Sequence, residues 1–182
     1  MRLGLFFTIT VEEFLKTSEA SDLKTLRKTV DELLALPEKE GAQEVRRIEN
    51  EIDIRRDYAM NDMPAYKCGT EYVNAALSTE QVIWNLFVHN YLMNLESRDL
   101  ASAILCSLNS EFVGSHDIFV ADDKNMLGIK SVKLASLLYP GAKVDIQRLN
   151  GFDALVDYRP AEKIIGFRAK HSIADYYKEL YG

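Results

Sequence analysis

NYLMNLESRDLASAIL, residues 90–105, is the stretch that decides how the second half of the chain folds. Ser97 or Asp99 can cap the first turn of a helix, because a short polar side chain accepts a hydrogen bond from a backbone N–H group there. Apolar residues continue through LASAILCSL, residues 100–108, without a proline or a glycine. The stretch therefore predicts a helix that opens near Ser97 or Asp99.

Around this helix, short apolar runs alternate with helical patterns. The runs that predict strands are residues 82–88, residues 117–121 and VDIQRL, residues 144–149. Further helices are predicted over about residues 129–138, ahead of the Tyr-Pro-Gly that follows them, and at AEKIIG, which closes on Gly166. Such alternation is typical of an α/β unit, so we expect residues 76–182 to form a small mixed α/β region.

The first 75 residues predict a mainly helical region. Thr10 followed by Glu13 fits a capping box at a helix start. Apolar residues recur every three to four positions over residues 22–58, and Pro37 separates two helices within that range. We expect the two helices to form a hairpin with a solvated outer face. The alternative is a coiled coil that binds a partner protein, but an apolar stripe of about three helical turns is too short to specify one. The turn-rich residues 61–69 are predicted to end the region.

Length and charge limit the classes of function. With 182 residues, 47% hydrophobic and 27% charged, the chain can bury one core, so we expect one domain or one domain with a helical extension. A net charge of −6 gives no overall attraction to nucleic acid or anionic lipid. No apolar run reaches the roughly 20 residues that span a bilayer. We therefore expect no nucleic-acid partner, no membrane partner and a cytoplasmic location.

The two cysteines, Cys68 and Cys106, are far apart and match no CxxC metal or redox spacing. We expect both to be reduced. Cys106 is predicted to lie in the core, among Ile104, Leu105 and Leu108.

Four segments of the second half follow one another in an order known from one enzyme family. NLESRDLA, residues 94–101, resembles a Y-I-D-x-R-D-L-A motif, and FVADD, residues 119–123, resembles an F-N-x-A-A-D-D strand. The YPG at residues 139–141 resembles a YPG that ends a helix in this enzyme family. Residues 160–172 resemble a closing pattern that leads to P-x-H-S-W. Over about residues 84–176 the chain thus resembles the carboxyl-terminal part of the NAD-dependent epimerase/dehydratase family, the extended short-chain dehydrogenases.

The resemblance implies a nucleotide sugar as substrate and NAD as the family's cofactor, but the cofactor-binding half is missing. The closest glycine pair, Gly141 and Gly151, is too far apart for a glycine-rich dinucleotide turn. The family's catalytic Tyr and Lys, four residues apart on one helix, have one formal match in Tyr139 and Lys143, which Pro140 and Gly141 interrupt. We therefore predict no catalytic residue, no cofactor-binding residue and no cofactor for the isolated chain. Dehydrogenase chemistry is expected only if another chain supplies the missing parts.

Arg148 and Arg98 are the candidate substrate-binding residues. A guanidinium can bind the diphosphate of a nucleotide sugar through two parallel hydrogen bonds. Arg148 ends a predicted strand, and Arg98 lies at the predicted helix start. The alternatives are a solvated side chain for Arg148 and a surface ion pair for Arg98.

No metal site is predicted from the sequence. His89, His116 and His171 have no histidine neighbour at a spacing that suits a helix or a hairpin site. The segment that holds Asp122, Asp123 and Asn125 lacks the glycine and the terminal glutamate of a calcium loop. Trp84 and the nearby aromatic residues are predicted to pack rather than to stack on a base, because basic residues do not alternate with them.

Two functions from different classes fit these observations. The first is a truncated epimerase/dehydratase-like protein that holds a nucleotide sugar without transforming it. The alternative is a non-enzymatic interaction or dimerisation module, whose helical hairpin covers one surface or offers it to a second copy or to a partner chain with the dinucleotide-binding half. A degenerate gene product whose fold persists without selected activity is a third reading.

Overall fold

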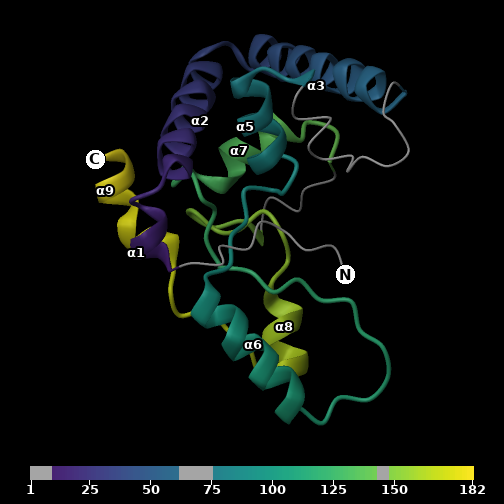
Figure 1. Ribbon diagram of the computed structural model, residues 1–182, viewed down its shortest axis with the longest axis vertical. Helices are drawn as coiled ribbons and strands as arrows, with labels where there is room; N and C mark the ends of the chain where they lie inside the picture. Colours follow the sequence, from purple (N-terminus) through teal and green to yellow (C-terminus); the bar gives the residue numbers. More distant parts are fainter. Residues whose placement is uncertain (1–9, 62–75, 143–147) are drawn as a thin grey trace.

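The computed structural model describes residues 10–61, 76–142 and 148–182, and helices dominate this part of the chain (Figure 1). The α-helices are α1 Val11–Phe14, α2 Ser18–Ala35, α3 Glu38–Asn61, α5 Thr79–Phe87, α6 Ser97–Asn109, α7 Ser131–Leu138, α8 Arg159–Ile165 and α9 Tyr177–Tyr181. A short 3₁₀ turn, Ile173–Tyr176, precedes α9. No β-strand occurs among the described residues, where Lys124 and Asp153 form an isolated antiparallel bridge. The predicted mixed α/β fold is therefore not confirmed, and the described fold is mainly helical.

The predicted helical hairpin is confirmed as α2 and α3. Pro37 lies between the two helices, where its fixed φ and its missing N–H group separate them. Leu23 and Val30 of α2 and Ile52 of α3 are each 0% exposed, so the two apolar stripes face the core. Gly41 of α3 lies so close to α2 that a Cβ atom built there would be 2.9 Å from the Leu33 carbonyl oxygen. The two helices approach closely because position 41 has no side chain.

The capping box predicted at α1 is also confirmed. The Thr10 side chain accepts a hydrogen bond from the Glu13 N–H at 3.2 Å, and the Thr10 N–H donates to the Glu13 carboxylate at 3.0 Å.

The strand predicted over residues 82–88 is wrong, because these residues form most of α5. Ser78 and Gln81 form a capping box, and the helix begins at Thr79, directly after Ser78. Ile83, Trp84 and Phe87 follow at helical spacing and are buried, with Trp84 only 2% exposed. A short apolar run is compatible with either structure, and the cap decides for the helix here. The packing predicted for Trp84 is confirmed.

The strand predicted over residues 117–121 is also wrong, because these residues lie in a loop. Ile118 and Val120 pack against the smaller core, while Phe119 between them is 46% exposed. The alternation of a strand is thus present, but among the described residues no neighbouring strand pairs with it. Residues 143–147, which hold most of the predicted strand VDIQRL, lie outside the described part, as do Cys68 and most of the connection at residues 61–69.

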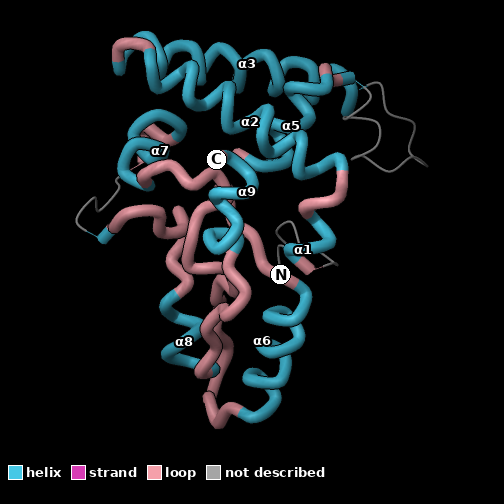
Figure 2. Tube along the Cα trace, turned by 90° about the vertical axis from the view of Figure 1, so that its left-hand side faces the viewer, coloured by secondary structure: helices cyan, strands magenta, loops and turns pink. Residues whose placement is uncertain are grey.

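The helices predicted at α6, α7 and α8 are confirmed. Gly166 ends α8 with a φ of 69°, a left-handed conformation that suits glycine. In Figures 1 and 2, α6 and α8 lie side by side at the end of the molecule away from α2 and α3. Cys106 of α6 is half-buried, with its sulfur 4.0 Å from the Gly166 carbonyl oxygen. Its predicted core environment is wrong in one respect, since Ile104, Leu105 and Leu108 are exposed.

Two clusters of buried apolar side chains hold the helices together. The larger cluster joins side chains of α2, α3, α5, α7 and α9. The smaller lies between α6 and α8 and contains Leu95, Ala103, Ala161, Ile165 and Phe167. Helices from both sides of residue 75 therefore share the larger core, and the boundary predicted there stays a prediction. None of the described helices is long and apolar enough to cross a bilayer.

Candidate functional site

Buried charged groups gather at the N-terminus of α6. Glu96 caps this helix, and its side chain is fully buried. Its carboxylate accepts hydrogen bonds from the Arg98 N–H at 3.0 Å and from Arg98 Nε at 2.7 Å. Arg98 also reaches Glu12 of α1 at 3.1 Å, and Tyr176 donates to Glu12 at 2.8 Å. The Glu12 backbone N–H, the Tyr176 hydroxyl and Arg98 lower the pKa of Glu12 to about 2, so this carboxylate is charged at neutral pH.

Asp99, in the first turn of α6, holds a loop that is distant in the sequence. Its side chain is 2% exposed. One carboxylate oxygen accepts the backbone N–H groups of Lys170 and His171 at 3.0 and 2.9 Å. The other lies 3.0 Å from His171 Nδ1. Buried carboxylate oxygens need hydrogen-bond partners, and Asp99 gains three from this loop.

Asp122 holds the next two residues of the same loop. Its carboxylate accepts the Ser172 hydroxyl at 2.9 Å, the Ile173 N–H at 3.0 Å and the Lys124 N–H at 3.1 Å. Burial raises the pKa of Asp122 to about 6, although these hydrogen bonds oppose the rise. Asp99 and Asp122 together fix residues 170–173, so the quoted motifs around residues 94–101, 119–123 and 160–172 meet at one place.

Glu96, Asp99 and His171 could hold a metal ion, since one ligand atom from each lies within 4.8 Å of the others. His171 Nδ1 is 3.0 Å from Asp99 and 3.6 Å from Glu96. A tetrahedral zinc ion with bonds of about 2.1 Å would separate its ligands by about 3.4 Å, so the spacing is suitable. Every one of these groups already has a hydrogen-bond partner in the protein. The hydrogen bonds account for the cluster without an ion.

The chemistry available to His171 is limited by its neighbours. The Asp99 carboxylate can accept a hydrogen bond from Nδ1 of His171. This arrangement favours the tautomer with the proton on Nδ1 and leaves Nε2 as the proton acceptor. A histidine held in this way can serve as a base if a nucleophile lies next to it. Ser172, the adjacent hydroxyl, instead donates to Asp122. The arrangement therefore orients and fixes a loop and does not assemble a nucleophile with its base.

The two predicted substrate-binding arginines belong to different parts of the molecule. Arg98 is engaged by Glu96 and Glu12, which corresponds to its alternative reading as an ion-paired side chain. Arg148 is exposed and lines a cleft of about 190 Å³ together with residues 153–159. Arg159 of the same cleft is paired with Asp157 at 2.7 Å.

Tyr139, the formal match to a catalytic tyrosine, performs a structural task. It caps the C-terminus of α7, and its hydroxyl donates to the Val88 carbonyl at 2.6 Å. Burial raises the pKa of Tyr139, whereas a catalytic tyrosine of this type needs a lowered pKa. Lys143 lies outside the described residues. That Tyr139 is not catalytic stays a prediction.

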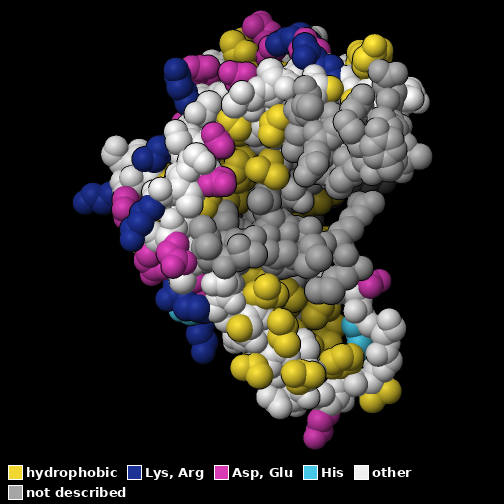
Figure 3. All heavy atoms as spheres, in the orientation of Figure 1, with side chains coloured by type: hydrophobic (Ala, Val, Ile, Leu, Met, Phe, Trp, Pro, Cys, Tyr) yellow, Lys and Arg dark blue, Asp and Glu magenta, His cyan; other side chains and the backbone are white. Residues whose placement is uncertain are grey.

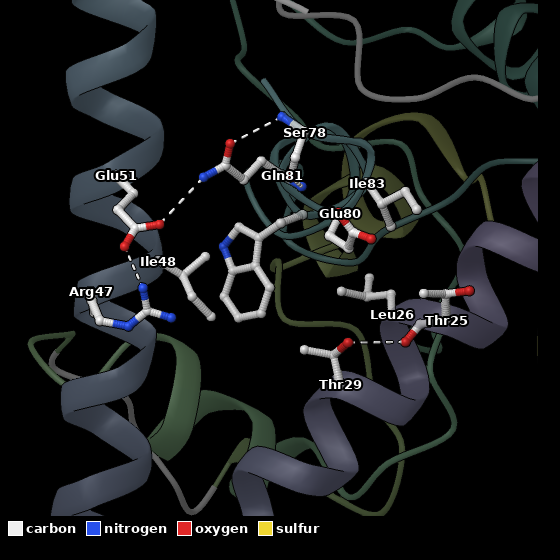
Figure 4. A pocket seen from close by; sticks show the side chains of 11 residues that line it. Thr25, Leu26, Thr29, Arg47, Ile48, Glu51, Ser78, Glu80, Gln81 and Ile83 are labelled. Carbon is white, nitrogen blue, oxygen red and sulfur yellow. Dashed lines mark hydrogen bonds and ion pairs between the residues drawn. The ribbon is translucent and has the colours of Figure 1, made fainter. Parts of the chain in front are cut away.

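A second candidate is a pocket of about 210 Å³ between α2, α3 and α5 (Figure 4). Leu26, Ile48, Ile83 and Trp84 supply its apolar wall. The polar groups at its rim bond to one another: Arg47 pairs with Glu51, and Gln81 donates to Glu51 at 3.5 Å. These polar side chains are held by one another across the rim, so they are not positioned to orient a ligand. We interpret it as a gap between three helices.

Sequence reasoning missed the carboxylate cluster. From the sequence, helix capping is favoured for Asp99 over contact with a ligand, and His171 is predicted to be isolated, yet the two side chains are in contact. Seventy-two residues separate them, and no local pattern reveals such a pair. A weak signal existed in Glu96 and Asp99, because two acidic residues lie within the first turn of a helix whose later residues, 100–110, carry no charge.

Comparison with known proteins gives no relative, since no family model, no curated protein and no solved structure matches the chain. The resemblance to the epimerase/dehydratase family therefore remains a prediction from the quoted motifs.

Proposed function

We propose that the chain is a binding protein derived from the substrate-side α/β lobe of an epimerase/dehydratase, and that it holds a nucleotide sugar without transforming it. The support for the derivation is that the three motif segments of the resemblance converge at Asp99 and Asp122. The support for binding without catalysis is that Tyr139 is occupied by the Val88 carbonyl and that no glycine-rich turn occurs in the sequence.

The cleft beside Arg148 is the place where we propose the diphosphate binds. Arg148 and Arg159 both line it, and guanidinium groups bind phosphate oxygens through charge-assisted hydrogen bonds. A cleft of about 190 Å³ cannot enclose a whole nucleotide sugar, so only the diphosphate would lie in it and the sugar and the base would lie outside. Asp157 competes for Arg159, so a bound diphosphate would have to replace that ion pair.

Calorimetric titration with a panel of nucleotide sugars, NAD and NADP tests this proposal. We expect a nucleotide sugar to bind without NAD, and Arg148→Ala to weaken the binding by about tenfold or more. Asp157→Asn should strengthen it, because the competing carboxylate is removed. Arg46→Ala, on the exposed side of α3, is the matched control and should change nothing. Tight binding of NAD, or no binding of any nucleotide sugar, would refute the proposal.

A further inference from the structure

The α6 helix presents an apolar surface to solvent at the end of the molecule away from α2 and α3. Figure 3 shows hydrophobic side chains gathered there, over the place where Figure 1 has α6 and α8. Three of them come from α6 and three from the loop after it, and each is at least 44% exposed. We call this set the α6 face: Ile104, Leu105, Leu108, Phe112, Val113 and Phe119.

Sequence and packing together produce this face. No charged residue occurs between Leu100 and Ser110, which is unusual for a helix with a solvated side. Ala103 and Cys106 turn toward the smaller core against α8. Leu105 is 59% exposed and Leu108 76% exposed on the side away from it. The helix thus has an apolar stripe on each side, and only one of them is covered.

The extent of the α6 face matches that of a stable protein interface. Its six side chains expose on the order of 700 Å² of mainly apolar surface, close to the ~800 Å² that each partner buries in an interface of standard size. Contiguous apolar patches larger than a few hundred Å² are rare on monomeric proteins. Ile54 and Tyr58 of α3 are also exposed, but these two side chains, one turn apart, form a smaller patch.

We propose that the α6 face binds the α6 face of a second copy of this chain, with the two helices antiparallel across a two-fold axis. Each chain carries a net charge of −6, which disfavours self-association elsewhere on the surface. The uncharged stripe is where two copies can meet without like charges in contact. A two-fold interface requires a self-complementary surface, and this stripe provides one.

An antiparallel pair centred between Ile104 and Leu105 is complementary in size and in charge. Ala101, which is exposed on the same stripe, would lie opposite the partner's Leu108, so a small side chain meets a large one. Arg98 at the start of α6 would lie toward the partner's Glu111, just beyond the end of that helix. Because Glu96 and Glu12 already hold Arg98, the partner's Glu111 would join a network of charges at the rim of an apolar centre, the usual anatomy of a protein interface.

Sedimentation of the full chain over a wide concentration range tests the proposal. We expect a reversible dimer with twice the 20.7 kDa mass of the chain. Leu105→Glu and Leu108→Glu should each raise the dimer dissociation constant by about a hundredfold, because they place a charge in the apolar centre. Both sites are exposed, so the variants should remain folded by circular dichroism. Ile54→Glu on α3, which is 69% exposed, is the matched control and should leave the dimer intact.

Cross-linking tests the orientation. With both native cysteines replaced by serine, Leu105→Cys should give disulfide-linked dimers on mild oxidation, because position 105 lies next to the two-fold axis. Ile54→Cys in the same background should not. A chain that stays monomeric at submillimolar concentration overturns the proposal. So does a dimer that survives Leu105→Glu and is lost with Ile54→Glu.

Discussion

Asp99 fixes the path of residues 170 and 171 through a single carboxylate. Asp99→Ala should lower the free energy of unfolding by about 2 to 4 kcal/mol, because two backbone N–H groups and His171 lose their acceptor. Urea denaturation measures this difference. Asp57→Ala, at an exposed position on α3, should change stability by less than about 0.5 kcal/mol. An equally small effect at Asp99 would mean that its hydrogen bonds to residues 170 and 171 do not stabilise the fold.

Asp122 makes stability depend on pH in an unusual direction for an aspartate. Its pKa rises from 3.8 to about 6 in the folded protein, so the folded state holds a proton that the unfolded state has already released. This contribution is fully present below pH 4 and is lost as the pH rises through about 6. Its size is roughly 2 to 3 kcal/mol.

The pH effect can be isolated with Asp122→Asn, which cannot ionise. The stability of the variant relative to the wild-type protein should increase between pH 4 and pH 7, because only the wild type loses its contribution over the range set by the two pKa values. Urea midpoints of both proteins at several pH values give this difference and cancel the other titrations. A difference that stays constant with pH would show that Asp122 does not titrate in this range.

At the scale of the helix, we expect Gly41→Ala to have the opposite effect on stability from the one that helix propensity predicts. Alanine is favoured over glycine in a helix by about 1 kcal/mol. The new Cβ atom, however, would lie 2.9 Å from the Leu33 carbonyl oxygen, a backbone atom that cannot move without shifting α2. Gly41→Ala should therefore destabilise the protein by about 1 to 2 kcal/mol in thermal unfolding. Gln43→Ala, exposed two residues later, should be neutral or slightly stabilising, and the same result at Gly41 would show that the helices separate easily.

Helices were predictable wherever the chain carries a local signal. Thr10 and Glu13, Pro37 and Gly166 each mark a helix end within a few residues, and the structure has those ends. Strands have no such signal, because they depend on a neighbour elsewhere in the chain. Residues 117–121 have the alternation of inward and outward side chains that a strand requires, and they still form a loop.

The candidate site was hard to predict for a related reason. Arg98 could be assigned to an ion pair from its sequence position, but its partner Glu12 is 86 residues away. The same holds for Asp99 with His171 and for Asp122 with Ile173. Long-range polar contacts leave no periodicity in the sequence, so only the folded structure reveals them.

At the scale of the whole molecule, the shared core predicts that residues 76–182 cannot fold alone. Ile83, Trp84 and Phe87 are buried in the cluster to which α2 and α3 also contribute, and a shortened chain would expose them. We expect this fragment to unfold without cooperativity and to show solvent-exposed fluorescence from Trp84, the only tryptophan. Adding a separate 1–75 fragment should restore the buried emission. A sharp transition in the fragment alone would establish residue 75 as a true domain boundary.

The hydrogen bonds between residues 170–173 and the two aspartates, Asp99 and Asp122, also determine when parts of the chain can fold during synthesis. Asp99 leaves the ribosome 72 residues before the His171 N–H that it will bind, an interval of about 4 to 14 seconds at usual rates of translation. Asp122 precedes Ile173 by 51 residues. During that interval neither carboxylate has its hydrogen-bond donors from residues 170–173. The newest part of the chain therefore has to come back to the older part before either aspartate can be buried.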